Sequence, residues 1–269
     1  MAEEGGYGFD EMYSRFSDDV LARVRRETYG DDLGQYSWTT KAELEVIFRA
    51  LGLGQGRRLL DVGCGAGGPA RFAARETGCG VVGVDNSDGA IATATRIAQE
   101  EGLQDKASFQ IADGGTRLLF ADASFDAVLC MDAIVLLPDR SAVLRDWARL
   151  VRPGGRVAFT DPGVLTGFAT MEELSLRTGG VGSFIFSVPG QNEALLKEAG
   201  LTLVLAEDSS STMERVAARA YASRSRHQAE LEKLEGKGAY AEQQRFYEGT
   251  RRLAADRRQS RLTYVVERS

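Results

Sequence analysis

Histidine is almost absent from this chain, which contains one among 269 residues, beside only three cysteines. Without clustered histidine and cysteine we expect no zinc site and no other metal centre. The cysteines, Cys64, Cys79 and Cys130, lie in or beside predicted strands and show no paired spacing. We therefore expect free thiols in a reducing, cytoplasmic compartment and no disulfide framework.

An excess of positive charge and long apolar runs are also missing. The formal net charge is −6, whereas a nucleic-acid partner normally requires a basic face. The apolar runs have the length of strands, so neither a signal peptide nor a membrane span is expected. What remains is a globular protein long enough to bury one full core and to carry a small cap.

One segment combines a short apolar run, a carboxylate and several glycines. Its sequence, LLDVGCGAGG at residues 59–68, is followed by a helical pattern at residues 70–74. This order predicts a strand, a tight turn and the start of a helix. Glycine permits strained backbone angles and close approach to a ligand. We therefore assign Gly63, Gly65 and Gly67 to a turn around a bound cofactor.

The glycine spacing also fits a dinucleotide site, and Asp61 argues against that alternative. Gly63, Gly65 and Gly68 satisfy the G-x-G-x-x-G pattern. A pyrophosphate beside Asp61 would meet a like charge, which is strongly repulsive in a partly dry site. A carboxylate suits a cationic ligand such as S-adenosylmethionine, which carries a sulfonium and an ammonium and no phosphate. A NAD-dependent dehydrogenase remains the other reading of the glycines.

The next two predicted strands also end at polar residues. The strand at residues 80–85 ends at Asp85, whose carboxylate is placed to accept both ribose hydroxyls. Asn86 follows it at the start of a helix. The strand at residues 107–111 runs into Asp113 and Gly114, which suit an adenine amine and a close backbone approach.

Two more apolar strands, at residues 125–131 and 157–161, flank a helix at residues 141–151. Near the end of the first of them, the backbone carbonyl of Cys130 is placed to receive a ligand ammonium. Five apolar strands that alternate with helices predict a doubly wound α/β sheet with polar residues at its carboxyl edge.

Together these segments resemble the class I S-adenosylmethionine-dependent methyltransferases. The matching pieces are LDVGCGAGG, VVGVD, IADGG, FDAVLCMDAIVLLPD and LVRPGGRVAFTD, which lie in the family order within residues 56–161. The resemblance implies S-adenosylmethionine as the cofactor, with Asp61 near its ammonium. It also implies a Rossmann-like, mostly parallel sheet of seven strands, with residues 261–267 as a last, antiparallel strand.

The segment YGDDLGQYSW, at residues 29–38, resembles the lead-in of bacterial and plant small-molecule methyltransferases. In those enzymes it folds over the cofactor as a lid. We expect Gln35 and Trp38 to contact the cofactor and Tyr29 to contact the substrate. The two aromatic residues could instead pack against the N-terminal helix.

Helical periodicity outside the sheet predicts a lid and a cap. Helices are expected at residues 9–26, 40–51, 90–101, 171–177, 192–199, 212–234 and 240–255, with a strand at 201–207. We divide the chain into an N-terminal helical lid (1–55), a cofactor-binding core (56–161), core completion with a helical substrate cap (162–260) and a terminal strand (261–269).

Methyl transfer from a sulfonium is an in-line displacement, which depends on alignment and exclusion of water. If the acceptor must lose a proton, His227 is the candidate general base, with Arg224 one turn away to bind an anionic group. Asp161, at the end of the fifth strand, is the second catalytic candidate. Asp132 and Phe186 are expected at the substrate. His227 could also be a satisfied structural histidine, and Asp132 could be a helix cap.

The sequence therefore predicts methyl transfer from S-adenosylmethionine to a nitrogen, carbon or oxygen atom of a small organic molecule, as in natural-product biosynthesis. Two alternatives stay open: a cyclase or isomerase that uses the same cofactor without transfer, and a regulator that only binds it. The sequence does not choose the substrate, nor does it decide between a monomer and a homodimer.

Overall fold

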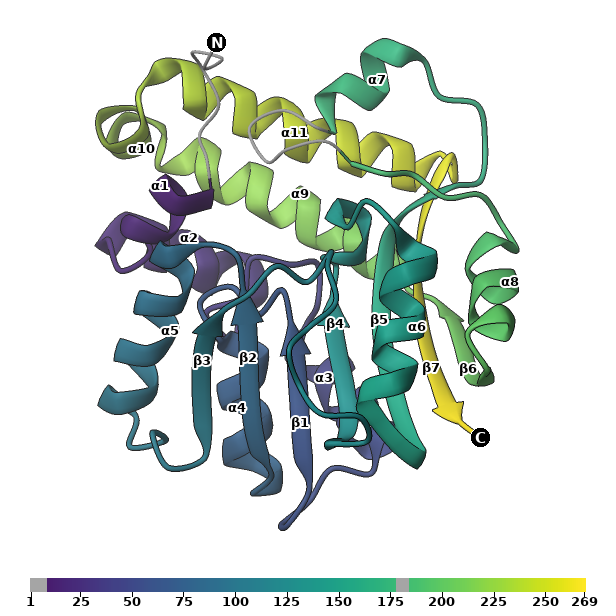
Figure 1. Ribbon diagram of the computed structural model, residues 1–269. Helices are drawn as coiled ribbons and strands as arrows, with labels where there is room; N and C mark the ends of the chain where they lie inside the picture. The colour runs from purple at the N-terminus through teal and green to yellow at the C-terminus, as the bar shows by residue number, and fades with distance from the viewer. Residues whose placement is uncertain (1–8, 178–183) are drawn as a thin grey trace, which may run out of the picture.

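The computed structural model describes residues 9–177 and 184–269, and a sheet of seven strands runs through them (Figure 1). The strand order is β3-β2-β1-β4-β5-β7-β6. In chain order the strands are β1 (Arg58–Val62), β2 (Gly80–Asp85), β3 (Ala107–Ile111), β4 (Phe125–Met131), β5 (Val151–Leu165), β6 (Leu201–Asp208) and β7 (Gln259–Arg268).

The pairing of the strands confirms the predicted doubly wound sheet. Strands β1 to β5 pair in parallel, and β7 is antiparallel to both of its neighbours, β5 and β6. The chain leaves β1 toward β2 on one side, while β4 lies on the other side of β1. A crevice forms at such a reversal, outside the carboxyl ends of the strands, and this is where open α/β sheets bind ligands.

Both faces of the sheet are covered, because successive strand residues point to opposite sides. Leu59 belongs to the core under α3 (Lys41–Leu51) and α4 (Gly68–Thr77). Leu60 belongs to the core on the other face, which includes Trp147 of α6 (Arg140–Leu150) and Leu196 of α8 (Gln191–Glu198). Helix α5 (Asp88–Glu100) packs on β2 and β3.

The N-terminal segment forms two helices where the sequence predicted one over residues 9–26. These are α1 (Phe9–Ser14) and α2 (Asp19–Tyr29). The break has a local cause, since Asp18 is extended and its side chain accepts a hydrogen bond from the backbone N–H of Val20. An aspartate in this position starts a new helix. Thr40 likewise starts α3 through a reciprocal capping box with Glu43.

Three long helical segments lie across the carboxyl edge of the sheet (Figure 1). They are α9 (Ser210–Arg226), α10 (Gln228–Glu235) and α11 (Lys237–Ala255), and the short helix α7 (Met171–Leu176) packs beside α11. The predicted helix over 212–234 is interrupted at His227, the residue between α9 and α10. A buried ion pair between Arg224 and Glu235 joins the two helices across this break.

The structure also bears on a membrane role. Within residues 9–177 and 184–269, no helix has both the length and the apolar character needed to cross a bilayer.

The pair between Arg224 and Glu235 yields a stability prediction. Glu235→Gln leaves the buried guanidinium of Arg224 without a carboxylate, and removing one partner of a buried ion pair costs about 3–5 kcal/mol. We expect the free energy of unfolding, measured in urea, to fall by about 3 kcal/mol.

Glu248→Gln is the matched control, because Glu248 pairs with Arg251 in the same cap but both side chains are more than one-third exposed. Its free energy of unfolding should change by less than about 1 kcal/mol. Equal losses in the two variants would contradict a structural role for the buried pair.

Candidate functional site

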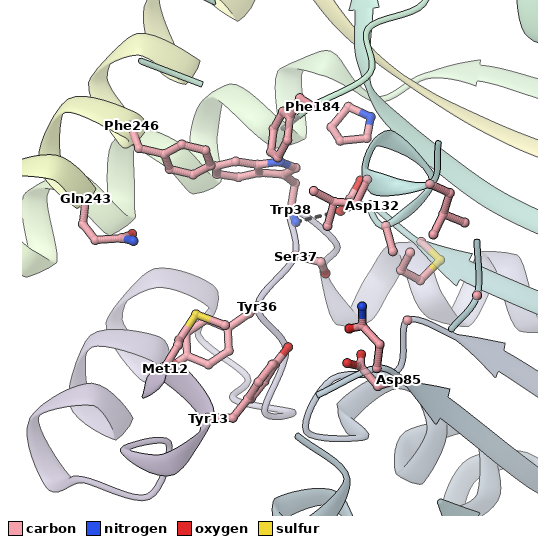
Figure 2. A pocket seen from close by; sticks show the side chains of 18 of the residues that line it. Met12, Tyr13, Tyr36, Ser37, Trp38, Asp85, Asp132, Phe184, Gln243 and Phe246 are labelled. Atoms are coloured by element: carbon pink, nitrogen blue, oxygen red, sulfur yellow. Dashed lines mark hydrogen bonds between the residues drawn. The ribbon is translucent and has the colours of Figure 1, made fainter. Parts of the chain in front are cut away.

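A cavity of about 560 Å³ lies at the carboxyl edge of the sheet, within the size range of small-molecule sites. Its walls come from the ends of the central strands, the loop at residues 29–38, and helices α1 and α11. Figure 2 shows Trp38, Phe184 and Phe246 gathered in one part of it, with Asp85 and Tyr13 in another. The cavity therefore has a polar end at the strands and an aromatic end under the cap.

The glycine turn after β1 has the strained backbone that its sequence predicted. Gly63, Gly65 and Gly67 all have positive φ angles, of 70°, 52° and 73°. Of the three, only Gly63 lines the cavity, where an added Cβ would lie 2.6 Å from the Cβ of Ala133. Tyr13 covers Gly65, and Gly67 begins α4. The turn thus exposes its backbone to the cavity at Gly63, and the other two glycines shape it.

Asp61 is buried below this turn, with 1% of its surface exposed, and does not line the cavity. Its Oδ2 has no hydrogen-bond partner in the described structure. Burial, and then the nearby charge of Asp85, raise the pKa of Asp61 to about 7. A buried carboxylate with an unpaired oxygen is costly unless a ligand or water supplies a donor. A cationic ligand at the turn would relieve that cost.

Three polar residues from the ends of β2 and β3 line the cavity together with Gly114, as the sequence predicted. The Asp85 carboxylate accepts hydrogen bonds from the backbone N–H groups of Gly65 (2.9 Å) and Ser87 (3.0 Å). These bonds fix the carboxylate against the glycine turn, and burial raises its pKa. Asn86 lies next to it, and Asp113 follows β3.

The loop at residues 29–38 brings Tyr29 and Trp38 to the cavity, but not Gln35. The Tyr29 hydroxyl donates to the carbonyl of Ser37 at 2.7 Å. Gln35 is 2% exposed, and its Oε1 accepts from the backbone N–H of Leu33 at 2.9 Å. The amide side chain of Gln35 therefore holds the loop in shape, which corrects its expected contact with the cofactor.

Asp132 lines the cavity, yet its carboxylate is already occupied. Oδ1 accepts from the Thr160 hydroxyl and from Nε of Arg261, both at 2.7 Å. Oδ2 accepts from the backbone N–H of Trp38 at 2.8 Å. The structure thus makes Asp132 a positioning residue that fixes Trp38, which corrects the expected direct contact between its carboxylate and the substrate.

The structure corrects the expectation for Asp161, which is fully buried and does not line the cavity. The reason is that β5 continues to Leu165, so Asp161 lies within the strand rather than at its end. Its carboxylate pairs with Arg140 and accepts hydrogen bonds from Ser187 and Asn192. Pro162 reaches the cavity instead.

His227 and Arg224 also lie outside the cavity, so the expected general base and its anion-binding neighbour are corrected. His227 occupies the break between α9 and α10, and its Nε2 lies 2.9 Å from Oε1 of Glu27 on α2. This contact, together with Ser223 and Arg226, lowers the pKa of Glu27 to about 2. The guanidinium of Arg224 is committed to Glu235.

Two further expected contacts fall to neighbouring residues. Cys130 is fully buried, and the next residue, Met131, lines the cavity. Phe186 does not line it, whereas Phe184, whose ring centroid lies 6.2 Å from that of Phe186, does. The residues that reach the cavity thus lie one and two positions away from the expected ones.

Several cavity residues were missed by sequence reasoning, and they come from the lid, the cap and the segment that follows β4. Tyr13 belongs to the apolar face of the N-terminal helical pattern, which predicts core packing as readily as a site. Gln243 and Tyr247 lie on α11, and nothing in their spacing distinguishes them from other helix positions. The missed lining residues are Met12, Tyr13, Tyr36, Ser37, Ala133, Leu136, Leu137, Gln243 and Tyr247.

Comparison with known proteins identifies the family. A family model described as a methyltransferase domain matches residues 59–155. The chain is 38% identical over 201 residues to the 27-O-demethylrifamycin SV methyltransferase of Amycolatopsis mediterranei, which covers 71% of this chain and 74% of that protein. The chain belongs to the class I S-adenosylmethionine-dependent methyltransferases.

Two further likenesses agree with this membership. Over 117 residues the chain is 41% identical to the methyltransferase GfsG of Streptomyces halstedii, a match that covers 44% of this chain and 42% of GfsG. The chain thus spans less than half the length of that relative. The cyclopropane synthase MmaA2 of Mycobacterium tuberculosis shares the fold, with a TM-score of 0.80 at 17% identity over 99% of this chain and 100% of that one.

The described residues of this methyltransferase fit S-adenosylmethionine, the cofactor of its family. Gly63 presents bare backbone to the cavity, because its positive φ and the nearby Ala133 leave no room for a side chain. The unpaired oxygen of Asp61 puts negative charge beneath it, and Asp85 adds a second carboxylate at the neighbouring strand end. These two carboxylates suit a ligand with an ammonium, a sulfonium and a ribose, and they would repel a pyrophosphate.

The raised pKa of Asp61 predicts binding that depends on pH. Below a pH of about 7 the carboxyl is largely protonated and offers no charge to a cationic ligand. We expect the affinity for S-adenosylmethionine, measured by calorimetry, to rise between about pH 5.5 and 7.5 as the carboxyl ionises. Asp61→Asn should remove most of that rise, and an unchanged rise in the variant would contradict this role.

The same pKa shift affects the stability of the ligand-free protein in the opposite sense. Because the folded pKa lies above the ordinary value of 3.8, the contribution of Asp61 to stability is fully present below that value and is lost as the pH rises through about 7. Asp61→Asn should therefore raise the free energy of unfolding at alkaline pH, by at most about 4 kcal/mol. A variant less stable than the wild type there would contradict the shift.

Proposed function

We propose that this protein transfers the methyl group of S-adenosylmethionine to a small organic molecule. The observation that carries the proposal is that one cavity contains both the polar strand ends and an aromatic compartment under the cap. Donor and acceptor can then lie side by side in one cavity, as the alignment of an in-line displacement requires. The similarity to an enzyme named as a rifamycin methyltransferase supports a natural product as the acceptor.

The residues of the chain would share the work between binding and alignment. Asp85 would accept the ribose hydroxyls, Asp113 would face the adenine, and Asp61 would balance the ammonium. The cofactor supplies an activated methyl group when it is bound. Trp38 and Tyr29 would close the lid over it, and exclude water from the reacting atoms.

No histidine lines the cavity in the part of the chain that the structure describes. The acceptor therefore either carries no acidic proton or loses it without a histidine base. We also propose a reducing, cytoplasmic location, in which the buried thiols of Cys64, Cys79 and Cys130 stay reduced.

The role of Asp85 is tested by cofactor affinity. Asp85→Ala should weaken S-adenosylhomocysteine binding by about 1.5–3 kcal/mol, the range for hydrogen bonds to a charged group. Calorimetry measures the effect, with Asp105→Asn, an exposed carboxylate on the surface, as the control that leaves affinity unchanged. Wild-type affinity in Asp85→Ala would remove this residue from the site, and tighter binding of NAD than of S-adenosylhomocysteine would overturn the cofactor assignment.

The reaction itself is tested with methyl-labelled S-adenosylmethionine and a panel of phenols, alcohols, amines and enols. Label in the product, with an equal amount of S-adenosylhomocysteine released, is the expected result. A cyclase or isomerase would instead convert its substrate in a cofactor-dependent way without incorporating label. That outcome would replace methyl transfer as the function while leaving the binding site intact.

A further inference from the structure

One buried positive charge lies near the cavity. Arg177, the residue that follows α7, is fully buried. Its Nε donates to Oε1 of Gln259 at 3.1 Å and its Nη1 to the hydroxyl of Thr250, so both acceptors are neutral. Its Nη2 is buried without a hydrogen-bond partner. Among the described residues no carboxylate forms an ion pair with it, and residues 178–183 contain no acidic residue.

This guanidinium is packed against the aromatic end of the cavity. Its central carbon lies 4.8 Å from the ring centroid of Phe246, 5.3 Å from that of Phe184 and 5.7 Å from that of Trp38. All three rings line the cavity. The rings of Trp38 and Phe246 are stacked, with centroids 5.7 Å apart and an interplanar angle of 20°. The guanidinium of Arg177 therefore lies behind the three rings, which separate it from the cavity.

The one acid whose charge affects the pKa of Arg177 forms no ion pair with it among the described residues. Asp132 raises the pKa of Arg177 slightly, but its carboxylate is occupied by Arg261, Thr160 and the backbone of Trp38. Burial has the larger effect and lowers the pKa of Arg177 to about 9, so the guanidinium stays charged at neutral pH. Other buried arginines differ, since Arg140, Arg224 and Arg261 each pair with a carboxylate.

An uncompensated buried charge is costly to the fold. Such a cost is usually found where function requires it. A positive charge buried in protein attracts an anion more strongly than the same charge would in water. It repels a cation equally, so it also acts against a positively charged acceptor in this part of the cavity.

We propose that the aromatic end of the cavity selects a methyl acceptor that carries a negative charge on a planar group, such as a phenolate, an enolate or an aryl carboxylate. Trp38, Phe184 and Phe246 supply the flat apolar surface, and Arg177 supplies the charge behind it. The proposal rests on the proposed function only in that it takes the bound anion to be the methyl acceptor. It accounts for a cavity with no histidine, because an acceptor bound as an anion needs no protein base.

The test compares a matched pair of probes on the full chain saturated with S-adenosylhomocysteine. The probes are 2-naphthoate and 2-naphthamide, which have the same shape and differ in charge. We expect calorimetry to show naphthoate binding to the wild type about tenfold more tightly or better. Equal affinities, or no naphthoate binding, would overturn the proposal without the use of any variant.

Arg177→Met removes the charge and keeps much of the side-chain volume. The two probes should then bind within about twofold of each other, because only the charge distinguished them. Arg251→Met, which removes an exposed arginine of α11, is the control that keeps the wild-type preference. A preference that survives in Arg177→Met would overturn the proposal.

Two further measurements separate this role from other roles of Arg177. Arg177→Met should melt at the wild-type temperature or above it, because the buried charge it removes is unpaired, and Arg177→Gln repeats the binding test if the methionine variant does not fold. S-adenosylhomocysteine affinity should be unchanged, and its loss would assign Arg177 to the cofactor carboxylate and overturn the proposal.

Failure of the proposed function gives a different result. If methyl-labelled cofactor yields no labelled product while naphthoate is still preferred, methyl transfer fails and the anion site stands.

Discussion

The geometry of the site depends on the buried ion pair between Arg261 and Asp132. Arg261 is fully buried on β7 and donates to Asp132 at the end of β4, to Glu43 on α3 and to the hydroxyl of Thr39. Asp132 in turn accepts from the backbone N–H of Trp38. The last strand, the central sheet and the lid loop therefore meet at one ion pair. Because removing one partner of a buried ion pair is strongly destabilising, this network holds Trp38 in one place over the cavity.

The cavity carries opposite charge at its two ends. Beneath the glycine turn, burial raises the pKa values of Asp61 and Asp85, and the charge of Asp85 adds to the rise at Asp61. Behind the aromatic wall, burial lowers the pKa of Arg177 for lack of an anion. Each end is thus costly to the empty protein, and each would be relieved by a ligand of the opposite charge. Such preorganisation agrees with a cationic donor at the strands and an anionic acceptor under the cap.

The strand-end residues could be predicted from the sequence, because parallel strands bring their carboxyl ends to one edge whatever covers them. Gly63, Asp85 and Asp113 were found in this way. Asp161 was misplaced because β5 runs beyond its apolar core, and no local signal marks that extension. The general-base role predicted for His227 was wrong for another reason. Helical periodicity predicts which face a side chain lies on only while the helix continues, and the helix breaks at His227. Cap residues such as Tyr247 depend on tertiary packing, which spacing along one helix does not reveal.

We expect one cavity to hold the methyl donor at the strand ends with its sulfur directed toward the aromatic end. The decisive measurement is a crystal structure of the full chain with S-adenosylhomocysteine. It should place the ribose at Asp85, the methionine portion at Gly63, and the thioether sulfur facing the compartment formed by Trp38 and Phe246. A cofactor bound elsewhere, or bound with its sulfur directed away from those rings, would rule this arrangement out.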